Sequence, residues 1–338
     1  LMKVLEITLN NGIDPCTGKQ VGIKTGDSTE FTLFDDLIAA YKKQLHYFID
    51  IKIKGNNLIE KLYATYMPAP FLSIIISDCI VNGKDYNAGG ARYNTTYIQG
   101  VGIGTITDSL AAIKYHVFEQ KNLSMTELLT ILKQNFAGHE NIQQQLINRT
   151  PKYGNDDDFA DDIMASVFTA FYEEVNGRIN MKGGVYRINM LPTTCHVYFG
   201  SVIGASPDGR NAREPLSEGI SPVQGADRFG PTAVIKSAAK MDQVKTGGTL
   251  LNQKFTPELL AEDTGLKAVA QLVRAYFKLD GHHIQFNVVD AETLRTAQKE
   301  PDKYKDLIVR VAGYSDYFNN LNKDLQDEII KRTEHKNF

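Results

Sequence analysis

The sequence has 338 residues, of which 42% are hydrophobic and 23% charged, and its formal net charge is −3. This length allows one large domain or two ordinary ones, and the evenly spread charges exclude a basic stripe for nucleic acid and a polybasic segment for a membrane surface. No apolar run approaches the roughly 18 residues that a membrane-spanning helix needs. The cysteines argue against a disulfide framework or a zinc site and favour a reducing cytoplasm, because Cys16, Cys79 and Cys195 are far apart and form no C-x-x-C pair.

Five ranges in the first half of the chain have the apolar periodicity of amphipathic helices. The first range has no N-cap residue, so we expect that the chain was cut from a longer one. In the third range Thr107 or Asp108 is a suitable N-cap, and in the fourth Ser124 and Glu127 have the spacing of a capping box. The five ranges are 1–12, 31–53, 107–120, 124–136 and 158–176.

Between about residues 180 and 260 the chain is rich in Gly, Pro, Ser and Thr. This composition predicts short strands joined by long loops, and long loops in compact domains are usually functional or disordered. The loops contain aromatic and β-branched residues, which favours order.

The last eighty residues predict a strand–helix–strand unit that follows a helix at 264–277. The first strand, HHIQFNVV, has Ile284, Phe286 and Val288 on one side, and the next helix is capped by Asp290. The second strand, DLIVRV, ends just before a glycine, at the strand end where function often gathers in α/β proteins. The face of the preceding helix comprises Leu266, Val269, Val273, Tyr276 and Phe277.

Two motifs suggest chemistry and have simpler explanations. GVGIGT at 100–105 lacks the G-x-G-x-x-G spacing, and no strand–turn–helix context is evident, so a dinucleotide site is disfavoured. TTCH at 193–196 suggests a Cys–His nucleophile, but in an extended segment Cys195 and His196 point to opposite faces. We therefore expect Cys195 to be a small buried apolar residue.

Two further motifs suggest metals. His282 and His283 alternate across a predicted strand without a second group of ligands, which favours structural histidines. NDDD at 155–158 resembles the start of a calcium loop but lacks the glycine and the terminal glutamate, so complementing the dipole of a helix N-terminus explains it better.

The stretch RVAGYSDYF at 310–318 contains the remaining candidate, Gly313. On its local pattern alone this glycine is a turn residue that ends a strand, because glycine tolerates positive φ. The wider sequence changes that interpretation. IVRVAGYSDYF resembles the signature of the glycyl radical enzymes, the pyruvate formate-lyase-like superfamily, and further segments resemble that superfamily in its order. They are GGARYNTTYIQGVGIGTITDSLAAIKY, GASPDGRNAREPLSEGISP, KTGGTLLNQKF and DGHHIQFNVVD.

The resemblance implies an α/β fold: half of a ten-stranded barrel surrounded by helices, followed by a C-terminal glycyl radical domain. The expected division is 1–210 for the barrel part and 211–338 for the radical domain, with the boundary in the loop at 208–216. The family is commonly dimeric, so a cytoplasmic homodimer is implied, with no nucleic-acid or membrane partner.

The resemblance also implies a radical on the α-carbon of Gly313 as the cofactor, with no bound metal or organic group. A Cβ there is expected to crowd the planar radical. A separate radical S-adenosylmethionine iron–sulfur enzyme would install the radical, and Arg310, Tyr314 and Asp316 would hold the loop or meet that activating enzyme. The family's G-C-x-E-like loop, which carries the catalytic cysteine and glutamate, is absent here and is expected in a more N-terminal portion.

The segments KQLHYFIDIKIKGN, TPKYGNDDDFADDIM and MLPTTCHVYFG are most similar to members that dehydrate trans-4-hydroxy-L-proline to 1-pyrroline-5-carboxylate. Thr193 then occupies the position of a threonine near the substrate; alternatively it is a strand-edge threonine that bonds the backbone. Two other functions stay open: a family lyase or dehydratase acting on glycerol, choline or a keto acid, and a partner protein that supplies a replacement radical domain without turnover.

Overall fold

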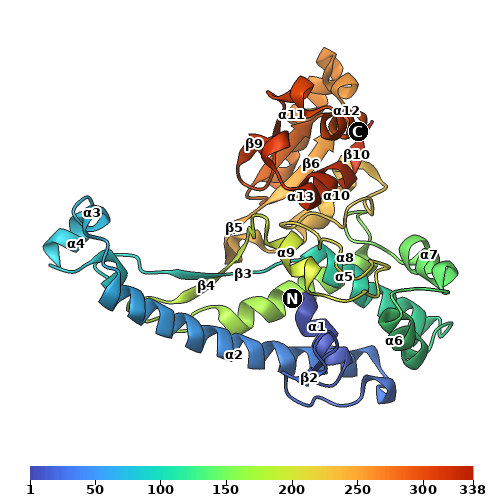
Figure 1. The fold of residues 1–338 in the computed structure, drawn as a ribbon, viewed down its shortest axis with the longest axis horizontal. Helices are drawn as coiled ribbons and strands as arrows, with labels where there is room; N and C mark the ends of the chain where they lie inside the picture. Colours follow the sequence, from blue (N-terminus) through green and yellow to red (C-terminus); the bar gives the residue numbers. More distant parts are fainter. Residues whose placement is uncertain (338) are drawn as a thin grey trace.

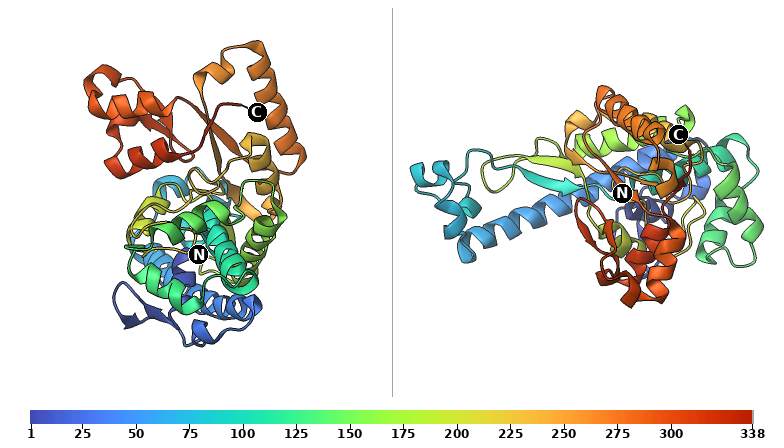
Figure 2. Two further views of the ribbon diagram at one scale, coloured as in Figure 1. Left: turned by 90° about the vertical axis from the view of Figure 1, so that its right-hand side faces the viewer. Right: turned by 90° about the horizontal axis from the view of Figure 1, so that it is seen from above.

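The computed structural model describes residues 1–337 and shows three parts (Figure 1). A helical body contains the first residue and most of the chain up to residue 250. An arm, residues 54–95, projects from the body and consists of the second half of one long helix and the loops and short helices after it. A C-terminal lobe, residues 251–337, lies on the opposite side of the body from the first helices, and the views in Figure 2 keep it distinct from the body.

The core of the body forms around α5, which packs against α8. Every residue of α5 is buried, including its polar residues Thr105, Thr107, Asp108 and Ser109. The body also contains a π-helical turn that continues α5 over Lys114–Glu119. The helices of the body are α1 (Met2–Leu9), α5 (Ile103–Ile113), α6 (Met125–Lys133), α7 (Glu140–Arg149), α8 (Asp158–Val175), α9 (Cys195–Ser201) and α10 (Gly230–Ala239).

The long helix α2 (Phe34–Tyr66) belongs to both the body and the arm. Up to Ile53 its apolar residues face the core at helical spacing, whereas none of its residues after Ile53 is buried. The helix therefore extends thirteen residues beyond the predicted range 31–53. In the arm it is followed by α3 (Pro70–Ser73) and α4 (Ser77–Val81).

Two parallel sheets, each of three strands, connect the parts. In the first sheet β4 lies between β3 and β5, and in the second β6 lies between β10 and β7. Within residues 1–337 these sheets do not close into a barrel. Their strands are β3 (Thr96–Gln99), β4 (Tyr186–Met190), β5 (Thr246–Thr249), β6 (Leu251–Phe255), β7 (Ile284–Val288) and β10 (Glu334–His335). A short antiparallel pair near the N-terminus comprises β1 (Ile13–Asp14) and β2 (Lys19–Gln20).

The predicted strand–helix–strand unit of the lobe is present, with β7 as its first strand, but its two strands do not pair with each other. The parallel unit is β6–α11–β7, with α11 at Asp263–Lys278, because the crossover helix returns the chain alongside β6. The second predicted strand, β8 (Ile308–Arg310), instead pairs antiparallel with β9 (Ser315–Tyr317). The lobe is completed by α12 (Ala291–Lys299), which Asp290 caps as predicted, and by α13 (Lys323–Lys331).

Three helix predictions are confirmed and two need correction. The first helix, the capping box of Ser124 and Glu127, and the helix over 158–176 are all present. The helix predicted to start at Thr107 or Asp108 starts at Ile103 instead, because Gly102 at φ +76° supplies the N-terminal turn and both polar residues are buried in the helix. In α11 the buried residues are Gly265, Leu272 and Tyr276, while Leu266 and Phe277 are exposed, so the core-facing side is rotated from the predicted face.

Candidate functional site

Gly313 lies in the loop at 311–314 that joins β8 to β9. The loop is closed by a hydrogen bond from the Val311 amide to the Tyr314 carbonyl at 2.9 Å. Gly313 has φ +79°, in the left-handed region that side chains rarely adopt. The backbone conformation at this position therefore favours glycine.

Within this chain the space around Gly313 would admit a Cβ without a close contact. A Cβ added to Gly313 would meet the Leu250 Cδ1 at 3.6 Å and the Leu191 Cδ1 at 3.8 Å, both ordinary van der Waals contacts. In this conformation the positive φ is what disfavours other residues, and the expected crowding of a planar radical by a Cβ stays a prediction. Leu191 also shows that the segment after β4 lies beside the loop.

Two buried polar side chains of β7 hold the strand that leads into the loop. The Gln285 Oε1 accepts hydrogen bonds from the Gly313 amide at 3.3 Å and from the Arg310 Nε at 2.8 Å. The Asn287 side chain accepts from the Arg310 amide at 2.7 Å and donates to the Arg310 carbonyl at 2.8 Å. Gln285 and Asn287 are the buried side of β7, the reverse of the apolar face that the sequence predicted.

The start of the loop is also bonded by Arg332, the residue that follows α13. The Arg332 Nη1 donates to the Val311 carbonyl at 3.0 Å, and the Arg332 Nη2 pairs with the Glu328 Oε2 at 2.8 Å. The His196 Nε2 of α9 lies 3.6 Å from the same carboxylate. Burial alone would raise the pKa of Glu328, but the charge of Arg332 and then His196 outweigh it and hold that pKa well below its usual range.

Of the other residues predicted around the loop, Arg310 also bonds the Ser315 hydroxyl at 3.3 Å. Gly313 and Tyr314 are exposed in this chain, and Asp316 is half-buried. Burial, followed by the nearby Asp316 carboxylate, raises the pKa of Tyr314. Arg310 thus holds the loop directly, whereas Tyr314 remains accessible beside Gly313.

Thr193 follows Leu191 by two residues and is therefore on the segment beside the Gly313 loop. It is exposed, has φ +52°, and its hydroxyl donates to the Pro192 carbonyl at 2.7 Å. The alternative of a threonine that bonds the local backbone is therefore present in this chain. The same position leaves the side chain accessible from outside.

The Cys–His motif is not on a strand, as the sequence suggested, because Cys195 starts α9. Adjacent helical residues do not face each other either, so the two side chains still form no direct pair. Cys195 is exposed, contrary to the predicted burial, whereas His196 is completely buried against α13. Cys16 and Cys79 are also free thiols.

The glycine-rich segment GVGIGT follows a strand, β3, and its last three residues begin a helix, α5, a context that was not evident from the sequence. The N-terminus of α5 is nevertheless closed by another loop of the chain. The Ser217 hydroxyl accepts a hydrogen bond from the Thr105 amide at 3.0 Å, and a Cβ on Gly104 would lie 2.8 Å from the Ser221 carbonyl oxygen. This packing leaves no space for a phosphate at the helix N-terminus.

Within the part of the chain that the structure describes, the only cluster of three possible metal ligands is Glu6, Asp14 and Cys16. The Lys3 ammonium already occupies it, at 2.6 Å from Glu6 and 2.7 Å from Asp14. The cluster of Glu6, Asp14 and Cys16 is therefore part of an ion-pair network with Lys3.

The acidic run before α8 behaves as predicted, because Asp157 caps the helix.

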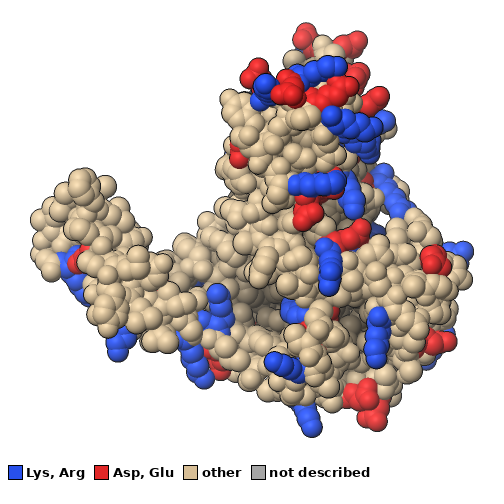
Figure 3. Space-filling view, viewed as in Figure 1, with Lys and Arg blue, Asp and Glu red and all other residues tan. Residues whose placement is uncertain are grey.

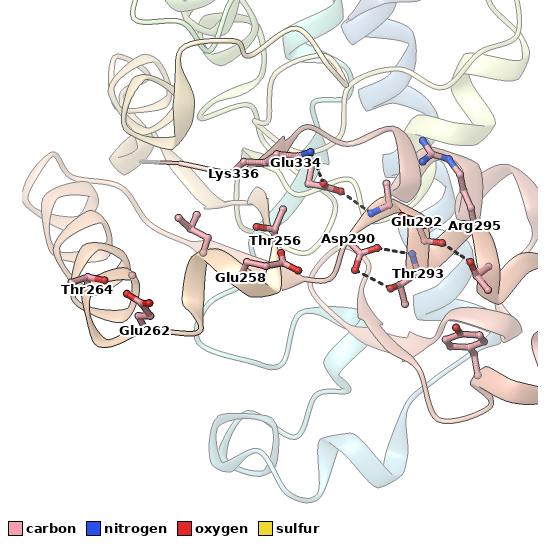
Figure 4. Close-up of a pocket in the computed structure, with 15 residues that line it drawn as sticks. Thr256, Glu258, Glu262, Thr264, Asp290, Glu292, Thr293, Arg295, Glu334 and Lys336 are labelled. Carbon is pink, nitrogen blue, oxygen red and sulfur yellow. Dashed lines mark hydrogen bonds and ion pairs between the residues drawn. The ribbon is translucent and has the colours of Figure 1, made fainter.

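A cavity of about 1150 Å³ lies in the lobe at the carboxyl ends of β6, β7 and β10 (Figure 4). Its lining carries Glu258, Glu262, Asp290 and Glu334, and Asp290 is already bonded to Thr293 as a helix cap. The residues that hold the Gly313 loop do not line this cavity. We therefore place the candidate site at the loop and exclude the cavity from it.

Comparison with known proteins gives matches along nearly the whole chain. Residues 1–200 match the family described as pyruvate formate lyase-like, and residues 216–319 match the glycine radical family. No helix in residues 1–337 has the length and apolar character to cross a bilayer.

The trans-4-hydroxy-L-proline dehydratase of Clostridioides difficile is 63% identical over 332 residues, which are 98% of this chain and 42% of that protein. The (2S)-3-sulfopropanediol dehydratase of Klebsiella oxytoca is 38% identical over 339 residues, 98% of this chain and 41% of that protein. The chain thus spans about two fifths of the length of these curated relatives.

Solved structures agree with these similarities. The Clostridioides difficile hydroxyproline dehydratase with bound trans-4-hydroxy-L-proline superposes with a TM-score of 0.97 at 62% identity, covering 99% of this chain and 42% of that one. The glycerol-bound B12-independent glycerol dehydratase of Clostridium butyricum gives 0.95 at 44% identity, with 99% and 42% coverage.

Proposed function

Because this chain belongs to the pyruvate formate lyase-like family and carries a glycine radical domain, we propose that it is the C-terminal part of a glycyl radical dehydratase acting on trans-4-hydroxy-L-proline. The observation that carries the proposal is the left-handed Gly313, held by Gln285 within the glycine radical match. The substrate is suggested by the 63% identity to the Clostridioides difficile dehydratase of that name.

In the proposed reaction Gly313 stores the radical on its α-carbon, between its own amide nitrogen and carbonyl. Within the complete enzyme it takes a hydrogen atom from a cysteine, and the resulting thiyl takes a hydrogen atom from C5 of the substrate. The C4 hydroxyl then leaves as water with the help of a proton donor. Return of the hydrogen atom and loss of a proton give 1-pyrroline-5-carboxylate, so substrate equals product plus water.

Neither the cysteine nor the glutamate of that step is assigned in this chain. None of its three cysteines stands in a G-C-x-E-like motif, and Cys195, the one nearest in sequence to the loop-side segment, is a free exposed thiol. We assign both groups to a further portion of the enzyme. Thr193 is proposed as a substrate-side residue because of its accessible place on the segment beside Gly313.

The proposed architecture follows from the same assignment. Residues 1–210 supply half of a ten-stranded barrel, including β3 and β4, and residues 211–338 form the radical domain and contribute β5 to the same sheet. The rest of the enzyme completes the barrel and covers Gly313, which is exposed in this chain. Two copies form a homodimer in the cytoplasm.

An activating enzyme of the radical S-adenosylmethionine type would form the radical. Its access to Gly313 is supported by the exposed loop and by the exposed Tyr314 beside it. Because oxygen cleaves a chain at a glycyl radical, the host is expected to be anaerobic. An activated sample that stays intact after exposure to air would contradict this expectation.

The test is an anaerobic assay for 1-pyrroline-5-carboxylate with the full-length enzyme, its activating enzyme and trans-4-hydroxy-L-proline, beside a Gly313→Ala variant. We expect product and a glycyl radical signal in the wild type and neither in the variant. The added methyl group meets only ordinary contacts, and the positive φ costs about 1–3 kcal/mol, so an unchanged circular dichroism spectrum is the control.

A second substrate class is favoured by a specific observation, the TM-score of 0.95 to a glycerol dehydratase. A Gly313 radical without product from hydroxyproline would move the assignment to glycerol, choline or a keto acid. A radical-domain partner without turnover is less well supported, because residues 1–200, which match the lyase family model, are superfluous to that role.

A further inference from the structure

Gln285 is the side chain that contacts the backbone of Gly313, and its own polar atoms are all engaged. It is the second residue of β7 and only 6% exposed. Its oxygen accepts from the Gly313 amide and from the Arg310 Nε, while its nitrogen donates to the Asn252 Oδ1 on the neighbouring strand β6. A buried amide with both ends bonded has one orientation.

Arg310 fixes which end of the Gln285 amide faces Gly313. A guanidinium can only donate hydrogen bonds, so the atom 2.8 Å from the Arg310 Nε must be the oxygen. Turning the amide over would place its NH₂ group against two donors and its oxygen against the Asn252 oxygen. The Gly313 amide therefore meets an acceptor and not a donor.

This contact acts on the atom that stabilises a radical at Gly313. A radical on the α-carbon is delocalised onto the amide nitrogen on one side and the carbonyl on the other, provided that the three groups are coplanar. An acceptor on the N–H polarises it and makes the nitrogen a better electron donor. At φ +79° the amide is not coplanar with the other groups, so rotation about the N–Cα bond must accompany flattening of the radical, and the same hydrogen bond restrains that rotation.

We propose that Gln285 is a positioning residue that sets the orientation and the electronic environment of the Gly313 radical. The inference rests on the proposed function and extends it to a side chain outside the radical signature. Asn287 allows a test of whether Gln285 acts on the radical or only anchors the loop. It is equally buried on the same side of β7 and bonds the Arg310 backbone twice, but none of its hydrogen bonds reaches Gly313.

The experiment compares the full-length enzyme, activated without oxygen, with its Gln285→Leu, Gln285→Glu and Asn287→Leu variants. The readouts are the lifetime of the radical and the electron–nuclear hyperfine couplings of its amide nitrogen and exchangeable amide proton. Loss of the acceptor should shorten the lifetime about tenfold in Gln285→Leu and change both couplings. Gln285→Glu keeps an acceptor and should shift the couplings in the opposite direction, whereas Asn287→Leu should leave them unchanged.

The outcomes separate the two levels of the proposal. If the hyperfine couplings in Gln285→Leu and Gln285→Glu equal those of the wild type, the inference is overturned and the proposed function stays intact. The same conclusion follows if Asn287→Leu changes the couplings as much as Gln285→Leu does. If Gln285→Leu accumulates no radical, the direction of the shift in Gln285→Glu decides. A wild type that never shows a Gly313 radical would overturn the proposed function and the inference with it.

Discussion

A cluster of buried charged side chains joins the radical domain to the body. Glu328 and Arg332 of α13 are both buried, and they meet His196 of α9 and the buried Glu218. Arg332 in turn bonds the strand before Gly313. The cluster therefore links the packing of the two parts to the position of the loop.

We expect Glu328→Gln to destabilise the protein at pH 7 by about 3 kcal/mol, because it leaves the buried Arg332 without its carboxylate. The folded-state pKa of Glu328 lies below its usual value of 4.5, so its contribution is complete above pH 4.5 and is lost as the pH falls further. The difference between wild type and variant, measured by thermal unfolding, should therefore shrink below pH 4.5.

Glu218 also titrates in this cluster. Its pKa is raised, chiefly by burial, so its contribution to stability changes with pH in the opposite sense, but Glu218 is present in both proteins. The control is Glu258→Gln, a substitution of an exposed acid of the lobe, which should leave the unfolding temperature unchanged at pH 7 and at pH 3. A Glu328→Gln deficit that persists undiminished at pH 3 would contradict the assignment.

At the scale of elements, two helical glycines have opposite surroundings. Gly55 is exposed in α2 and an added Cβ would meet no atom of this chain within 4 Å. Gly55→Ala should therefore raise stability by about 0.5–1 kcal/mol, since alanine loses less backbone entropy in a helix. Thermal unfolding of the full-length enzyme measures it, and a loss would show that another part of the enzyme packs against Gly55.

Gly104 in α5 is the contrasting case. Its Cβ would lie 2.8 Å from the Ser221 carbonyl oxygen and 3.0 Å from the Ser217 hydroxyl. We expect Gly104→Ala to lower stability by about 1–3 kcal/mol, because backbone must move to admit the methyl group. Gly55→Ala provides the matched substitution, and equal unfolding temperatures for both variants would refute the close packing of this loop.

These elements also show what the sequence could and could not predict. The helix over 158–176 was predictable because its periodicity and cap are local. The burial of Gln285 and Asn287 was not, since it depends on a loop that arrives some 25 residues later; the alternation of polar residues in HIQFNVV was the available signal. The pairing of β8 with β9 was missed because a three-residue strand carries no parallel or antiparallel signal of its own.

The candidate site divides in the same way. Gly313 was found from its signature, and its positive φ agrees with the turn that the local pattern also indicated. Arg332 and Glu328 were not found, because each looks like an exposed charge on an amphipathic helix until the body covers it. Cys195 was expected to be buried because TTCH was taken as a strand, whereas it begins a short helix.

At the scale of the whole molecule, the arm exposes many large apolar side chains. Figure 3 shows few charged side chains on this face of the arm. Phe71 is 86% exposed and Val81 82%, and other large apolar residues surround them. An apolar surface of this kind marks an interface. The chain spans about two fifths of the length of the curated relatives it matches, so we propose the rest of the same enzyme as the occupant.

The assignment predicts the behaviour of the enzyme when it is expressed as two polypeptides, this chain and the remainder. The two should copurify, and Phe71→Asp or Val81→Asp should weaken their association at least about tenfold, because a charge would replace a buried anchor. Phe229→Asp, at a phenylalanine on the body that is 75% exposed, is the matched control and should leave the affinity unchanged. If the arm substitutions instead split a dimer and leave the association of the two polypeptides unchanged, a second copy covers the arm. If they change neither the dimer nor this association, the arm is no interface, and another surface must enclose the exposed Gly313 loop.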